Sequence, residues 1–352
     1  MTNDLLESKR ARIGQSTVIA CGVLSFVFAV AGVLIGPLDV TLGDLAGIVT
    51  GSEDVSQVKK GVVLNIRLPR MFLGLAVGAS LGVAGASMQG FFRNPLADPA
   101  LIGVSAGGAL AAVSIIVLGG TLLTGLVALL GPFAMPLSAF AGSLAIVLLI
   151  YRISMQEGRV IVATMLLAGV AANALAVSGI GYLTFLADDT QLRDLTFWTL
   201  GSLGGATWTR AIPALCLMVI GIIGMLRLAR PLNSLLFGEG DAASLGTNVE
   251  AAKAQAAFFT ALSVGAATAV CGVIGFVGLV VPHLVRLVTG PDHRYVLPGS
   301  ALLGSALVLG ADLIARMAVV PAELPLGVVT AAVGAPFFFW LLVRDKKRGG
   351  YG

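Results

Sequence analysis

Continuous apolar runs, each about as long as a lipid bilayer is thick, recur along almost the whole chain. A helix that crosses a bilayer needs about 20 consecutive apolar residues, and it satisfies its own backbone hydrogen bonds in a solvent that offers none. A membrane β-barrel would instead need alternating segments of about ten residues. Since 57% of the residues are hydrophobic and 11% are charged, too little polar surface remains to cover a water-soluble domain. The sequence therefore predicts an all-α polytopic membrane protein.

We expect about ten membrane helices from the lengths of the apolar runs. The eighth segment is too short to cross a bilayer as a straight helix, so we expect it to lie buried against protein. The predicted segments are 14–36, 67–90, 99–118, 124–151, 160–186, 208–228, 252–274, 276–288, 296–317 and 325–343.

Small residues recur every four positions along the second segment, where they form one continuous stripe. Such a stripe lets another helix approach closely in lipid, where the hydrophobic effect does not drive helices together. The pattern predicts a tight helix crossing along Gly74, Gly78, Gly82, Ala86 and Gly90.

The basic residues are concentrated at helix ends on one side of this topology. With both chain ends inside, 15 of the 22 Lys and Arg residues fall on the inner side, as the positive-inside rule requires. The net charge of +4 is thus read as a topology signal and not as a nucleic-acid-binding surface. We expect a cytoplasmic tail over 1–13, a transmembrane domain over 14–344 and a second cytoplasmic tail over 345–352.

The sequence lacks the motifs of an enzyme that uses ATP or a metal. No G-x-x-x-x-G-K-[ST] phosphate loop and no H-E-x-x-H motif occurs, so we predict a transport subunit without its own power source. A secondary carrier would need ionisable groups at mid-membrane, and the helix centres are nearly devoid of them. Asp312 and Arg316 are spaced to form an ion pair on one helix, either as a structural pair or as a functional one.

The longest cytoplasmic segment, from about Arg230 to Lys253, carries few basic residues but several apolar ones. Gly238, Gly240 and Gly246 are expected to punctuate two short helices there. Such an element either lies on the bilayer or docks a soluble partner in a groove, and its low Lys and Arg content favours docking.

Five separated motifs then give the chain a resemblance to a known family. They occur in the family's order, and the resemblance covers about 15–344. Together they resemble the FecCD family of ABC importer permeases, which move iron-siderophores, heme and vitamin B12. The motifs are Arg67-Leu68-Pro69-Arg70, Met88-Gln89 followed by Arg93–Pro99, Gly103–Gly107, Gly275–His283 and Ala322–Gly327.

The resemblance implies a vitamin B12 permease-like (type II ABC importer) subunit in a bacterial cytoplasmic membrane. It further implies a homodimer with a central pathway, two ATPase subunits below it and a periplasmic or lipid-anchored substrate-binding protein outside. ATP and Mg would be used by the ATPase, and this chain would bind no cofactor or metal of its own. The segment at about 232–250 would supply coupling helices, with contacts from Gly238, Glu239, Asp241, Ala242, Ala243, Leu245 and Gly246.

By the same resemblance, Arg67, Arg70 and Arg316 match outer arginines that pair with glutamates of a binding protein. The cytoplasmic gate would involve Val162, Ala163 and Thr164, two of which are apolar where the vitamin B12 member has hydroxyl residues.

The cargo is expected to be heme or a related iron chelate, with ferric siderophore or vitamin B12 as alternatives. The basis is that 183–189 and 192–205 are similar to heme permeases. His283 and His293 are not expected to bind iron, because both lie on the cytoplasmic side of the predicted topology.

Overall fold

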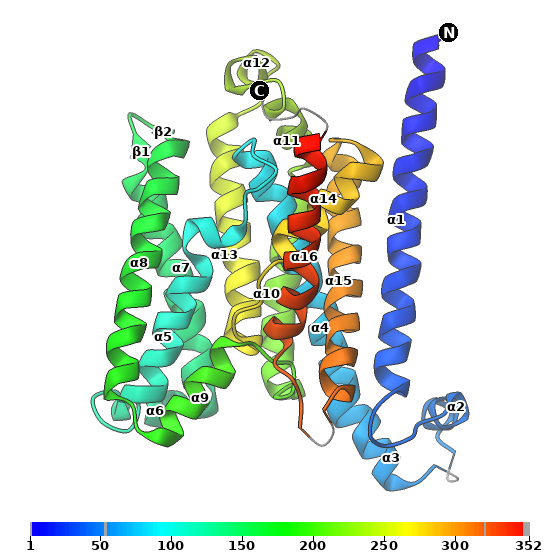
Figure 1. Cartoon of the computed structure of the whole chain (residues 1–352), viewed down its shortest axis with the longest axis vertical. Helices are drawn as coiled ribbons and strands as arrows, with labels where there is room; N and C mark the ends of the chain where they lie inside the picture. The colour runs from blue at the N-terminus through cyan, green and yellow to red at the C-terminus, as the bar shows by residue number, and fades with distance from the viewer. Residues whose placement is uncertain (1, 53–54, 320–321, 348–352) are drawn as a thin grey trace.

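The computed structural model describes residues 2–52, 55–319 and 322–347, and it shows a bundle of long helices (Figure 1). Ten helices of the described residues coincide with the ten predicted segments. They are α1 (Thr2–Leu34), α4 (Leu68–Phe91), α5 (Val104–Leu118), α7 (Ala134–Ile153), α8 (Val162–Leu186), α10 (Trp208–Leu226), α13 (Val249–Cys271), α14 (Val277–Thr289), α15 (His293–Met317) and α16 (Leu326–Lys347).

Seven of the helical segments in the described part of the chain are long and apolar enough to cross a membrane. Three others, α5, α14 and the apolar part of α16, are shorter. The membrane class is thus confirmed, whereas ten separate crossings remain a prediction. The short eighth segment is confirmed as α14, whose 13 residues follow a sharp bend at Phe276, where φ is +69°.

Shorter elements connect the bundle helices, and most of them were not predicted. A hairpin of two-residue strands joins α7 to α8, with Met155 opposite Val160. The connecting elements are α2 (Leu42–Thr50), α3 (Gln57–Val62), the π-helix η1 (Val63–Arg67), η2 (Pro99–Ile102), α6 (Thr124–Leu130), η3 (Gly131–Phe133), β1 (Met155–Gln156), β2 (Arg159–Val160), α9 (Asp189–Thr199), α11 (Ala229–Leu235) and α12 (Glu239–Ser244).

Two predicted boundaries were wrong for physical reasons that the structure makes clear. The first helix begins at Thr2 and not at residue 14, because charged residues continue it beyond its apolar part. The predicted helix 124–151 is interrupted by η3, where Gly131 takes a positive φ of 53° and Pro132 lacks an amide hydrogen.

The predicted glycine stripe lies where α4 crosses α15, the pair of helices with the most extensive contact in the bundle. A Cβ atom at Gly78 would collide with the carbonyl of Gly304, and one at Gly82 would collide with the carbonyl of Ser300. The predicted tight crossing is therefore confirmed. It makes α4 the most buried of the membrane-length helices, whereas α8 is the most exposed.

Candidate functional site at the two ends of the bundle

The elements that carry the predicted site residues lie at two opposite ends of the bundle (Figure 1). The start of α1, the end of α16, the β1–β2 hairpin, α11 and α12 share one end. The π-helix η1, the start of α4 and the end of α15 lie at the other end. This arrangement agrees with the predicted placement of both termini beside the coupling segment, and it separates that segment from the three predicted docking arginines.

The three arginines of the second end lie close together but are largely buried. Arg67 ends η1, Arg70 lies in the first turn of α4, and Arg316 lies in the last turn of α15. Their exposed fractions are 4%, 8% and 7%. In this conformation their guanidinium groups contact the chain's own oxygens, so contact with a partner requires some of these bonds to open.

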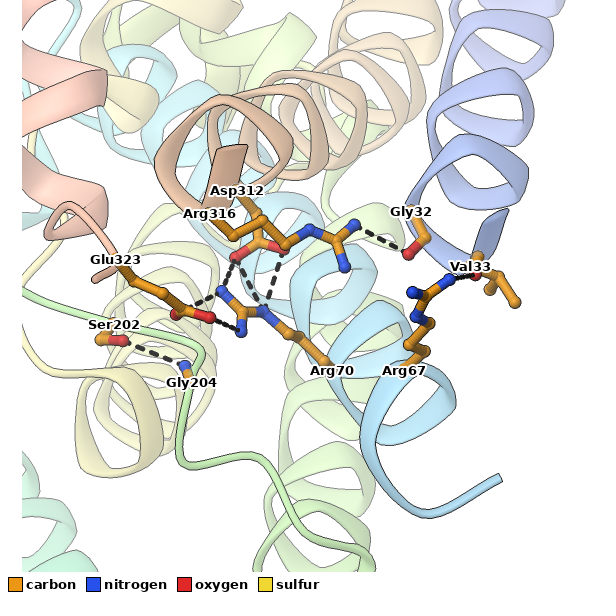
Figure 2. A network of polar contacts seen from close by, with 9 residues as sticks. All are labelled: Gly32, Val33, Arg67, Arg70, Ser202, Gly204, Asp312, Arg316 and Glu323. Atoms are coloured by element: carbon orange, nitrogen blue, oxygen red, sulfur yellow. Dashed lines mark hydrogen bonds and ion pairs between the residues drawn. The ribbon is translucent and has the colours of Figure 1, made fainter. Parts of the chain in front are cut away.

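Arg70 is held between two carboxylates from distant parts of the sequence (Figure 2). Its Nη2 donates to Asp312 Oδ1 at 2.8 Å and its Nε lies 3.1 Å from both Asp312 oxygens. Its Nη1 and Nη2 donate to the two oxygens of Glu323 at 2.8 and 2.9 Å. A guanidinium suits this arrangement because its planar fork of donors matches carboxylates in a bidentate way. Arg70 thereby joins α4, α15 and the segment that precedes α16.

Arg67 and Arg316 bind backbone carbonyls at the end of α1. Arg67 Nη1 donates to the carbonyls of Val33 at 2.7 Å and Leu34 at 2.8 Å, and its Nη2 donates to the carbonyl of Leu38. Arg316 Nη2 donates to the carbonyl of Gly32 at 2.7 Å. The last carbonyls of a helix lack intrahelical partners and attract cations, so these two arginines cap the C-terminus of α1.

The predicted Asp312–Arg316 pair is present, but it is the weaker of the contacts that Asp312 makes. Arg316 Nε lies 3.8 Å from Asp312 Oδ2, whereas Arg70 forms hydrogen bonds with the same carboxylate. Sequence reasoning missed Glu323 as a member of the network, although it lies in one of the family motifs. Its side chain is 40% exposed, and the hydrogen bonds from Arg70 lower the pKa of its carboxyl below the ordinary value of 4.5.

The predicted coupling segment protrudes from the other end of the bundle as two short helices, α11 and α12 (Figure 1). Gly238 and Gly246 flank α12 with φ values of +112° and +82°, as predicted for glycines that separate short helices. Gly240 lies inside α12, so the prediction that it separates helices was wrong. Ala242 is fully buried and anchors α12. Most of the other predicted coupling residues are exposed: Glu239, Asp241, Ala243, Leu245 and Gly246.

The coupling segment also presents large apolar side chains to the outside. Phe237 and Leu245 are each 69% exposed, and Leu236 is 39% exposed. The three residues follow the ends of α11 and α12, and exposed apolar side chains grouped in this way mark a surface for a protein or a membrane. Asn233 fixes the base of the segment, because its Oδ1 accepts from the backbone nitrogen of His293 at 2.8 Å and its Nδ2 donates to Asp292 at 2.7 Å.

The predicted gate residues lie at the same end of the bundle. Val162, Ala163 and Thr164 form the first turn of α8, directly after the β1–β2 hairpin. Ala163 is exposed and the other two are partly buried. Their small apolar and hydroxyl side chains line the start of the most exposed helix of the bundle.

His283 lies within α14, and His293 lies at this end, where α15 begins. His293 is fully buried, and its Nδ1 lies 2.9 Å from Asn233 Oδ1, so it belongs to the junction between α11 and α15. Within the part of the chain that the structure describes, no group of three His, Cys, Asp or Glu side chains is placed to hold a metal ion.

Comparison with known proteins places this architecture in a family. The profile of the FecCD transport family matches residues 23–344. The hemin transport system permease protein of Yersinia pestis is 48% identical over 286 residues, covering 81% of this chain and 84% of that protein. The cobalamin import system permease protein of Halobacterium salinarum is 42% identical over 307 residues, covering 87% of this chain and 79% of that protein.

A solved structure has the same fold. It is a chain assigned to the metal-chelate type of ABC transporter, in an inward-facing conformation, with a TM-score of 0.81 and 27% identity. The match covers 94% of this chain and 99% of that chain. The predicted fold class is thus confirmed. From its motifs, its helix bundle and these relatives, the chain belongs to the FecCD transport family and is a permease subunit of an ABC importer.

Proposed function

We propose that this permease forms the pathway for heme across the bacterial cytoplasmic membrane, driven by ATP hydrolysis in a partner subunit. The single observation that supports heme as the cargo is the 48% identity to the hemin transport permease of Yersinia pestis. The 42% identity to a cobalamin permease keeps vitamin B12 as a second candidate, with a ferric siderophore as a third. In this proposal both chain ends lie in the cytoplasm, which the excess of basic residues on that side supports.

The motor attaches at the coupling segment in this proposal. Two ATPase subunits, one for each permease copy, receive the exposed apolar side chains Phe237 and Leu245 in a groove. ATP and Mg are bound by those subunits, and this chain holds no cofactor. The protruding α12, flanked by glycines of positive φ, supports this assignment.

The substrate-binding protein docks at the opposite end. Arg67, Arg70 and Arg316 mark that surface, where Arg70 binds the carboxylates of Asp312 and Glu323. The other two guanidinium groups bind backbone carbonyls at the end of α1. Because Glu323 is the more exposed carboxylate, a carboxylate of the binding protein takes its place on Arg70 during docking.

Two copies of the chain enclose the pathway. The outward face of α8 supports this assembly, because it presents small residues, Ala171, Ala174, Ser178 and Gly181, to the outside. Small residues permit close contact between helices in lipid, and they also leave room for a wide, weakly binding pathway. Val162, Ala163 and Thr164 close its cytoplasmic end.

Reconstitution in liposomes tests the proposal. The permease is combined with its co-encoded ATPase and binding protein, and uptake of hemin, cobalamin and a ferric siderophore is compared with and without ATP. We expect ATP-dependent hemin uptake and no ATP hydrolysis by the permease alone. Uptake of cobalamin but not hemin would reassign the cargo, and ATP-independent uptake by this chain alone would refute the function.

A further inference from the structure

A lysine is buried where the coupling segment meets the bundle. Lys253, in the second turn of α13, is 1% exposed, which is rare for a lysine. Its Nζ lies 2.8 Å from Glu239 Oε2, 3.2 Å from Glu250 Oε1 and 3.2 Å from the carbonyl oxygen of Val160. An ammonium group offers three donors, and three oxygens from three different elements surround this one.

The same network binds both backbone polar groups of Val160, its carbonyl oxygen and its nitrogen. Glu250 accepts from Lys253 with one oxygen, and its other oxygen, Oε2, accepts from the backbone nitrogen of Val160 at 2.8 Å. Val160 closes the β1–β2 hairpin opposite Met155 and stands two positions before Val162, the first residue of α8. The position of Val160 therefore fixes where α8 begins.

The other end of the network is Glu239, the first residue of α12. Glu239 is exposed, and it follows Gly238, whose φ of +112° separates α12 from the preceding turn. The ion pair with Lys253 thus joins a protruding helix to the interior of the bundle. Lys253 is the buried member of this network, whereas the side chains of Glu239 and Glu250 are 48% and 30% exposed. Ion pairs to such exposed carboxylates contribute little net stability, but together they hold α12, α13 and the hairpin at one point.

We infer that Lys253 is a positioning residue that transmits displacement of α12, through Val160, to the gate at the start of α8. This inference rests on the proposed function, because it assigns the motor to α12 and the gate to Val162, Ala163 and Thr164. Hydrogen-bond and salt-bridge networks can carry such coupling between sites. The network is short: α12 pairs with Lys253 through Glu239, and Lys253 contacts the hairpin directly.

The test uses the complete complex of permease, ATPase and binding protein in liposomes, with hemin as cargo. Lys253→Met removes the ammonium group at nearly constant volume. Glu239→Ala removes the link to α12, together with one predicted ATPase contact, and leaves Lys253 with Glu250 and Val160. It protects the test against a folding failure of the first variant. Arg152→Met is the matched control, because Arg152 is an exposed cation near the end of α7, outside both the network and the coupling segment. The quantities measured are ATPase retained on purification, the rate of ATP hydrolysis and cargo moved per ATP.

We expect both network variants to retain the ATPase and to hydrolyse ATP while cargo moved per ATP falls about tenfold, a usual size for coupling between sites. Arg152→Met should match the unmodified complex. Unchanged cargo per ATP in both network variants would overturn the inference. Loss of ATPase retention in both would also overturn it, since Lys253 would then merely build the docking surface.

A second readout separates this inference from the choice of cargo. An environment-sensitive label is placed on Ala163→Cys in a Cys216→Ser background, because Cys216 is an exposed cysteine. We expect ATP to change the label's signal in the otherwise unmodified complex and not in Lys253→Met. If the signal responds equally in both, the inference fails whatever the cargo is. If hemin uptake is absent but the label responds as expected, the cargo alone was wrong.

Discussion

Replacement of Arg70 by Met should be among the most destabilising single changes at the outer end of the bundle. Arg70 and Asp312 have side chains that are 9% and 5% exposed, and Arg70 donates to Asp312 and Glu323 with every nitrogen of its guanidinium group. Without it, the buried carboxylate of Asp312 keeps only the distant Arg316 Nε, 3.8 Å away, among its ion-pair partners. The change therefore leaves a buried charge largely uncompensated.

The magnitude follows from the burial of each partner. Removal of one member of a buried ion pair costs about 3–5 kcal/mol, so we expect Arg70→Met to lower the free energy of unfolding by that amount. Glu323 is 40% exposed, and water screens it, so Glu323→Gln should cost less than about 1 kcal/mol. The double variant Arg70→Met/Asp312→Asn should recover part of the loss, because it no longer leaves the Asp312 carboxylate buried without Arg70. Arg316 stays a buried cation that keeps its hydrogen bond to the Gly32 carbonyl.

The assay is unfolding of the purified protein in mixed micelles with an increasing fraction of SDS, followed by far-UV circular dichroism. Arg193→Met is the matched control, because Arg193 is an exposed arginine of α9 at the same end of the bundle. The reasoning is refuted if Arg70→Met costs no more than Arg193→Met, or if the added Asp312→Asn change deepens the loss. Either result would mean that Asp312 is not held as a buried charge by Arg70.

Three further predictions use the same unfolding measurement. Arg70 lowers the pKa of Glu323 below 4.5, so the stability that the Glu323 carboxylate contributes is complete above pH 4.5 and is lost as the pH falls through the lowered pKa. The stability difference between the unmodified protein and Glu323→Gln should therefore shrink below pH 4.5. A difference that grows there would contradict the pairing. Gly82→Ala should cost about 1–3 kcal/mol through overpacking against the Ser300 carbonyl, whereas Gly125→Ala, in open space on α6, should change stability by less than about 0.5 kcal/mol; equal effects would argue against the α4–α15 crossing. Asn233→Ala should cost about 1–3 kcal/mol, because the buried backbone nitrogen of His293 loses its acceptor, and protection of that amide from hydrogen exchange should fall with it.

Most of the fold could be predicted from local properties of the sequence. The length and apolarity of the segments located every bundle helix. A helix in lipid forms all its backbone hydrogen bonds within itself, so its sequence alone is enough to predict it. The four-residue spacing of small residues located the α4 crossing for a similar reason: residues four apart lie on one helix face. Most short connecting elements were missed. Two examples are the break at Gly131 and Pro132 and the β1–β2 hairpin, each of which depends on a few residues within a long apolar context.

At the two ends of the bundle, the sequence and the tertiary structure determine different properties. The predicted topology put Arg67, Arg70 and Arg316 on one side and α12 and the start of α8 on the opposite side, since both follow from which helix ends share a side. Tertiary structure alone decided what those side chains bind. Asp312 and Glu323 reach Arg70 across 242 and 253 residues, and Glu239 reaches Lys253 from a separate helix. A charged group within a bundle takes the partner that packing brings within about 3 Å, a typical hydrogen-bond length, and sequence spacing does not record that distance.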